Sequence, residues 1–124
     1  MIVGLGVELV ETERFEAALD RFGERLHARL FTSAERAYAA GRARAAESLG
    51  VRFAAKVAAR RALGDPRVRW TEVEVVRGAR QAPRLALHGA AATAARTLGA
   101  RHWNVTLSHD ASWCVSQVVL EGSD

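Results

Sequence analysis

Four basic side chains within one short stretch are the strongest chemical signal in the sequence. Arg52, Lys56 and Arg60 recur every four residues, so a helix would present them as one stripe, and Arg61 would border that stripe. Arginine binds phosphate oxygens through a planar fork, and lysine binds them as a compact point charge. The spacing therefore indicates either a phosphate-binding stripe or a solvated basic face of a helix.

Side chains that could complement this stripe lie far from it in the sequence. Glu8 follows an apolar run near the start of the chain, and His109 and Asp110 lie in a polar stretch near its end. A carboxylate can hold a divalent cation, and a histidine can carry a proton near neutral pH. Simpler roles stay open: an ion pair with an arginine for Glu8, a turn for Asp110 and an incidental position for His109.

A second series of basic residues precedes the stripe. Arg14, Arg21, Arg25 and Arg29 are separated by seven, four and four residues, so an unbroken helix would present them together. Gly23 lies between them and could interrupt the helix. Such a face would attract an acidic partner.

The composition narrows the classes of protein and partner. With 124 residues, 49% of them hydrophobic and 26% charged, we expect a single globular domain over residues 1–124. The formal net charge of +4 favours an anionic partner, although a proteome rich in arginine would explain it equally well. Nucleic acid is an unlikely partner because no paired aromatic residues form a stacking platform on one strand face.

The cysteine content and the apolar runs bear on the compartment. The only cysteine, Cys114, excludes an intramolecular disulfide and fits a reducing compartment. No apolar run is long enough to span a bilayer, and Glu8 interrupts the first apolar stretch, which argues against a signal peptide. We therefore expect a cytoplasmic protein that does not bind membranes.

Local patterns predict an α+β domain in which short strands flank a group of helices. Thr12 could cap the first helix, and Thr32 with Glu35 fits a capping box for the second. Gly64 would end the third helix. Strands are expected over 2–7, 73–77, 85–87, 102–108 and 113–121, and helices from 12, over 32–38, 44–63 and 90–98. This order indicates an antiparallel-leaning sheet packed with helices.

Three segments together resemble the holo-[acyl-carrier-protein] synthase family of 4'-phosphopantetheinyl transferases. They are GLGVELVETER from Gly4 to Arg14, GVRFAAKVAARRALG from Gly50 to Gly64, and TLSHD from Thr106 to Asp110. The resemblance implies the 4'-phosphopantetheinyl transferase (holo-ACP synthase-like) fold. It also implies a homotrimer with active sites between neighbouring subunits. The implied reaction moves 4'-phosphopantetheine from coenzyme A to a serine of an acyl carrier protein, in fatty acid or polyketide biosynthesis.

The resemblance also implies roles for individual residues. The family's magnesium ligands are an aspartate and a glutamate, at the positions where this chain has Glu8 and Val57. Glu8 is then the possible metal ligand, and Asp110 of a neighbouring subunit is a second candidate. The implied catalytic residues are Glu8, Lys56 and His109. The residues implied for coenzyme A binding are Arg52, Lys56, Arg61 and His109. The residues implied for docking of the carrier protein are Arg14, Arg21 and Arg25.

Valine at position 57 leaves two hypotheses for the function. In the first, Val57 fills space on a buried helix face, and a weak transferase remains that needs unusually high magnesium. Glu47 lies roughly 15 Å upstream along a helix, too far to replace the missing ligand. In the second, the protein has lost transfer activity and binds carrier proteins, or acts on a carrier-linked or polyketide-like substrate in the cleft between subunits.

Overall fold

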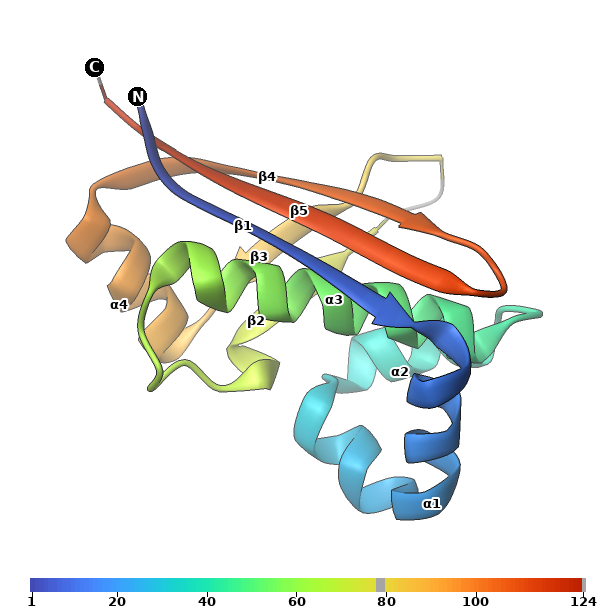
Figure 1. Ribbon diagram of the computed structural model, residues 1–124. Helices are drawn as coiled ribbons and strands as arrows, with labels where there is room; N and C mark the ends of the chain where they lie inside the picture. Colours follow the sequence, from blue (N-terminus) through green and yellow to red (C-terminus); the bar gives the residue numbers. More distant parts are fainter. Residues whose placement is uncertain (78–79, 124) are drawn as a thin grey trace.

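A three-stranded antiparallel sheet forms one layer of the protein. The computed structural model describes residues 1–77 and 80–123. Strand β5 (Trp113–Gly122) lies in the middle of the sheet, between β1 (Ile2–Glu11) and β4 (Ala100–His109) (Figure 1). Pairing with β5 continues to the Glu11–Trp113 pair, so β1 runs four residues beyond the predicted end at Val7. Glu8 therefore lies within a strand and not at its end.

Helix α3 (Ala45–Leu63) lies across one face of this sheet (Figure 1). Gly4 and Gly6 of β1 face the helix, and a Cβ atom at either position would overlap the carbonyl oxygen of Ala62 or Ala58. The two glycines therefore let the backbones of strand and helix approach closely. This contact fixes the position of Glu8, two residues further along β1, relative to α3.

The remaining elements surround α3. Helices α1 (Thr12–Leu30) and α2 (Ser33–Ala40) cover its first half, and α4 (Gly89–Leu98) lies near its end (Figure 1). The short helix η1 (Trp70–Glu72) precedes a hairpin of β2 (Val73–Val76) and β3 (Arg84–Leu87). The mixed α+β class and the predicted order of elements are thus confirmed.

Two of the three predicted helix ends are confirmed by the structure, and one is wrong. The capping box is present, because the Glu35 amide donates to Thr32 Oγ1 and the Thr32 amide donates to Glu35 Oε1. Helix α3 ends at Gly64, which has a φ of 68°. The predicted cap at Thr12 is wrong: Glu11 precedes the helix, and the buried Thr12 hydroxyl donates to the Asp110 carbonyl at 3.2 Å. The Thr12 hydroxyl therefore makes a tertiary hydrogen bond to the turn between β4 and β5 and does not cap α1.

On the face of the sheet turned away from α3, several large apolar side chains along β1 and at the start of β5 are exposed. Leu5, Val7 and Leu9 of β1 are 56%, 54% and 54% exposed, and Trp113 of β5 is 48% exposed. These residues alternate with the inward-facing glycines and Glu8, as the pleat of a strand requires. Among the described residues, no helix is both long and apolar enough to cross a membrane.

Candidate functional site

Helix α3 separates the predicted site residues into two groups. Arg52 and Arg61 are nine residues apart, which at about 100° per residue turns their side chains to opposite sides of the helix. Arg52 faces a pocket that also includes His109, whereas Arg61 reaches the Glu8 carboxylate on β1. Within one protomer, the structure brings together Arg52 with His109 and Arg61 with Glu8, but it does not bring together all four.

Lys56 belongs to neither group, because its side chain is completely buried. The ammonium group donates to Glu35 Oε1 at 2.7 Å, to the Trp70 carbonyl at 3.0 Å and to the Val73 carbonyl at 2.5 Å. Burial lowers the pKa of Lys56, and the charge of Glu35 opposes that effect. All three donor positions are used inside the protein, so the structure does not support the predicted contact of Lys56 with coenzyme A phosphates.

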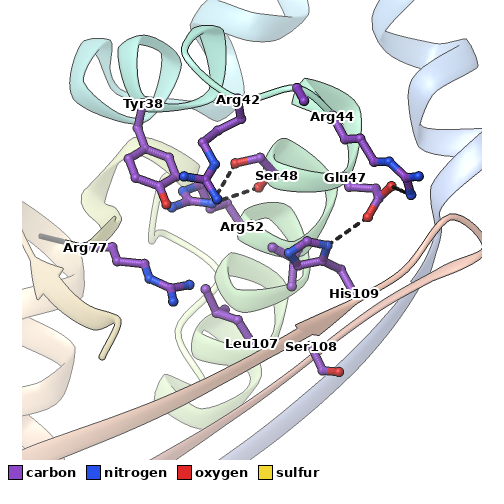
Figure 2. A pocket seen from close by; sticks show the side chains of 12 residues that line it. Tyr38, Arg42, Arg44, Glu47, Ser48, Arg52, Arg77, Leu107, Ser108 and His109 are labelled. Atoms are coloured by element: carbon purple, nitrogen blue, oxygen red, sulfur yellow. Dashed lines mark hydrogen bonds and ion pairs between the residues drawn. The ribbon is translucent and has the colours of Figure 1, made fainter. Parts of the chain in front are cut away.

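The pocket beside Arg52 has a volume of about 400 Å³. It lies where the start of α3, the end of α2 and the end of β4 meet (Figure 2). Its lining consists of Tyr38, Arg42, Ala43, Arg44, Glu47, Ser48, Val51, Arg52, Arg77, Leu107, Ser108 and His109. Four arginines against one carboxylate give this pocket an excess of positive charge, which suits a phosphorylated ligand.

Arg52 is a fixed part of this pocket rather than a mobile surface residue. It is 3% exposed, its Nη1 donates to the Ser48 carbonyl and hydroxyl at 3.1 and 2.9 Å, and its guanidinium stacks on the Tyr38 ring at 4.3 Å. Its buried Nε–H has no hydrogen-bond acceptor among the described residues. The basic stripe is therefore not a solvated face, because Arg52 and Lys56 are both buried.

His109 is held by a carboxylate that arrives from α3. Its Nδ1 lies 2.9 Å from Glu47 Oε1, while Arg44 Nη1 donates to the other oxygen, Glu47 Oε2, also at 2.9 Å (Figure 2). The hydrogen bond from His109 and then that from Arg44 hold the pKa of Glu47 below its ordinary value. Glu47 is therefore an ionised carboxylate at neutral pH, and His109 Nδ1–H is the donor of the bond.

Glu8 and Arg61 form the second group. Arg61 Nη1 donates to Glu8 Oε1 at 3.2 Å and to the Val7 carbonyl at 2.8 Å, and the Leu9 amide also donates to Glu8 Oε1. Both side chains are partly exposed, so they can still meet a ligand from solution. Val57 lies one helical turn before Arg61, half-buried in an open pocket that Arg60, Arg61 and Trp70 share. The prediction that Val57 fills a buried helix face is therefore only partly right.

The donors around Glu8 do not make a magnesium site within one protomer. Glu8 supplies a single carboxylate that is already paired with Arg61, and Val57 supplies no oxygen. No cluster of three or more histidine, cysteine, aspartate or glutamate residues able to hold a metal exists in the described part of the chain. Asp110 Oδ1 accepts the amides of Ser112 and Trp113, so in its own subunit it stabilises the turn between β4 and β5.

The predicted docking arginines lie on α1, which is not continuous. Gly23 has a φ of 62° and a ψ of −144°, so the helix changes direction there. Arg14 and Arg21 are exposed before this break, and Arg25 is exposed after it. Arg21 lies over the ring of Phe22, itself 56% exposed, at 5.2 Å. Arg14 and Arg21 remain one candidate surface, and Arg25 belongs to the second segment.

Several residues that line the pocket carry no signal in the sequence. The sequence suggests Glu47 only as a replacement metal ligand, and it suggests no site role for Arg42, Arg44 or Arg77. Glu47 and His109 are 62 residues apart, and no local pattern relates them. Only the crossing of β4 over the start of α3 brings them together.

Comparisons with known proteins agree along the whole chain. A family model described as the 4'-phosphopantetheinyl transferase superfamily matches residues 4–118. The holo-[acyl-carrier-protein] synthase of Anaeromyxobacter sp. (strain K) is 47% identical over 127 residues, which cover 99% of this chain and 98% of that protein. The protein of the same name from Streptomyces coelicolor is 43% identical, with 98% of each chain covered.

Solved structures give the same picture of the fold. A holo-(acyl-carrier-protein) synthase from Bacillus anthracis, in complex with CoA (3',5'-ADP), is 33% identical with a TM-score of 0.80, and 99% of each chain is covered. The synthase from Neisseria meningitidis has a TM-score of 0.88 at 23% identity, covering 98% of this chain and 99% of that one. The second match supports the fold alone.

Proposed function

The chain belongs to the 4'-phosphopantetheinyl transferase superfamily, and we propose that it transfers 4'-phosphopantetheine from coenzyme A to a serine of an acyl carrier protein. The observation that carries this proposal is the pair of separate basic groups on α3, one around Arg52 and His109 and one around Arg61 and Glu8. Their charge suits a ligand that carries several phosphates. The full-length relatives favour this activity over the hypothesis of a repurposed, inactive protein.

The two groups do not share a pocket within one protomer. Arg52 and Arg61 face opposite sides of α3, and each lines a different pocket, so a second copy would bring the two groups to one active site. The open apolar face of Leu5, Val7 and Leu9 offers a surface on which copies can associate. We propose a homotrimer in which the Arg52–His109 pocket of one subunit faces the Glu8–Arg61 pair of the next.

The chemistry of the transfer assigns tasks to these residues. The serine oxygen forms a bond to the phosphorus that carries pantetheine while the diphosphate bond breaks, 3',5'-ADP leaves with the bonding electrons, and the serine proton passes to a base or to a phosphate oxygen. Arg52 and Arg61 neutralise phosphate charge that builds up as the diphosphate breaks. His109 Nε2, which has no hydrogen-bond partner among the described residues, can take up a proton or donate one to a phosphate oxygen. Glu8 holds Arg61 in place through its ion pair.

The residues present within one protomer do not fit a magnesium ion. The only carboxylate at the expected position, Glu8, is shared between Arg61 and the Leu9 amide. Activity that requires a divalent ion would therefore depend mainly on phosphate oxygens and water as ligands, with at most one carboxylate from this protomer. We propose a weak response to magnesium at low concentrations of the ion.

The proposal extends to the partner and the compartment. An acidic carrier protein would dock on the exposed Arg14 and Arg21 of α1, next to the exposed ring of Phe22. A cytoplasmic location rests on the single cysteine, Cys114, which is free and buried in β5.

Mass spectrometry tests the activity directly. Apo-acyl carrier protein, coenzyme A and the purified protein are incubated with and without magnesium. The mass of the intact carrier protein is then measured. We expect the mass increment of one phosphopantetheine group, absent when the acceptor serine of the carrier is replaced by alanine. An unmodified carrier at every magnesium concentration, with the protein folded and assembled, would overturn the proposal.

A further inference from the structure

We infer that Glu47 is a positioning residue that fixes which nitrogen of His109 carries the proton at the active site. The inference rests on the proposed function for its meaning in catalysis, but its structural core can be tested separately. Glu47 is only 7% exposed and lies at the start of α3, whereas His109 ends β4. The carboxylate is therefore a fixed point of the scaffold, and the imidazole is the group that it orients.

The hydrogen bond determines the tautomer of His109. A carboxylate can only accept, so Nδ1 must carry its hydrogen whether the ring is neutral or charged. Nε2 has no hydrogen-bond partner among the described residues and belongs to a ring that lines the basic pocket. The neutral ring thus presents a lone pair at Nε2, and the charged ring presents an N–H there.

Because Arg44 occupies one oxygen of Glu47, the His109 tautomer depends on whether the other terminal atom of residue 47 is an oxygen or a nitrogen. The two oxygens of Glu47 accept from two different donors, His109 Nδ1–H and Arg44 Nη1, each at 2.9 Å. A glutamine has only one accepting oxygen, and an arginine can only donate. In Glu47→Gln the oxygen therefore turns to Arg44, and the NH₂ group turns to His109 Nδ1. The hydrogen of His109 would then move to Nε2, and the lone pair would no longer face the pocket.

Other charged groups near His109 do not compete for Nδ1. Arg42, Arg52 and Arg77 line the same pocket and have only donors, and the Asp110 carboxylate accepts from the Ser112 and Trp113 amides. Cys114 contacts the Glu47 backbone carbonyl and not its carboxylate. In the described part of the chain, Glu47 is the one carboxylate that contacts the His109 ring.

Nitrogen-15 NMR of the histidine side chains, at a pH where the rings are neutral, tests the structural core. We expect the Nδ1–H form of His109 in the wild type and the Nε2–H form in Glu47→Gln. In Arg44→Ala alone, Glu47 keeps two accepting oxygens, so the Nδ1–H form should persist. An unchanged tautomer in Glu47→Gln, or loss of the Nδ1–H form in Arg44→Ala, would overturn the inference even if the protein proves to be inactive.

Kinetics separate positioning from a merely structural role. We expect Glu47→Gln to lower kcat by about tenfold or more. A general base contributes on the order of 100-fold or more, and in this variant His109 Nε2 would carry a hydrogen and could not accept the proton of the substrate. The same substitution in a His109→Ala background should have almost no further effect. If the two losses multiply, Glu47 acts independently of His109 and the inference fails.

Discussion

Lys56 and Glu35 form a fully buried ion pair, with Nζ 2.7 Å from Oε1, at the junction of α2, α3 and β2. Glu35 also caps α2 at Thr32 and accepts the Val75 amide at 2.9 Å. Lys56 in turn satisfies the carbonyls of Trp70 and Val73. This pair connects the helical layer to the small hairpin and explains why the only lysine of the chain lies in its interior.

Removing one partner of this pair should destabilise the fold strongly. In Lys56→Met the Glu35 carboxylate would remain buried without its counter-charge, at a cost of about 3–5 kcal/mol in the free energy of unfolding. Urea denaturation followed by circular dichroism measures the change. Arg101→Met, at an exposed position on β4, is the matched control and should change stability by less than about 0.5 kcal/mol. Equal effects of the two substitutions would contradict the structural role of Lys56.

The ionised Glu47 should make its contribution to stability depend on pH. Its pKa in the folded protein lies below the ordinary value of 4.5, so the contribution is complete above 4.5 and is lost as the pH falls through the lower folded value. The difference in unfolding free energy between wild type and Glu47→Gln should therefore shrink as the pH falls below 4.5. Denaturation curves of both proteins between pH 7 and pH 3 measure it, and a constant difference would count against this pKa.

Val57→Glu should strengthen the response to magnesium. The new side chain would extend into the pocket beside Arg61 and place a second carboxylate near Glu8. We expect a higher rate of carrier modification and a lower magnesium concentration at half-maximal rate. Val57→Gln has nearly the same shape without the charge and should not show this gain. A wild type as responsive to magnesium as Val57→Glu would show that our account of the metal is wrong.

The two arginines before the break in α1 should dominate docking of the carrier protein. Arg14→Glu combined with Arg21→Glu would lose two exposed charge pairs, each worth up to about 1 kcal/mol, so the affinity should fall by up to roughly 30-fold. Arg25→Glu, beyond Gly23, should cost less. Arg96→Glu on α4, at the other end of the molecule (Figure 1), is the control. Calorimetry at low and high salt measures the affinities. An affinity that changes neither with salt nor in the double variant would exclude this surface as the docking site.

Mixed assemblies test whether the active site spans two subunits. His109→Ala and Arg61→Ala should each keep only a small, measurable residual rate on their own, because each removes a group from one of the two basic groups. When the two variants are mixed and reassembled in equal amounts, about one quarter of the sites would combine an intact Arg61 with an intact His109 of the neighbour. We expect about one quarter of the wild-type rate. No recovery, in assemblies with three times the chain mass of 13.4 kDa, would place the whole site within one subunit.

The sequence by itself determined those features that depend on neighbours along the chain. The capping box of Thr32 and Glu35 and the end of α3 at Gly64 are local conformational preferences, and both were predicted correctly. The break at Gly23 was raised from the sequence as an open alternative. The three motifs predicted the family, and the local patterns predicted the order of elements. Thr12 could either cap α1 or make a tertiary hydrogen bond, and the local pattern predicted the cap, which is wrong.

Only the tertiary structure decided which chemical groups meet. The four-residue spacing placed Arg52 and Lys56 on one stripe, but the packing of α2 and the hairpin against α3 determined that the stripe is buried and that Lys56 pairs with Glu35. The Glu47–His109 bond joins residues 62 positions apart. Such contacts depend on how helices and strands cross in space, because the free energy of burying a charge is set by groups that the local sequence does not contain.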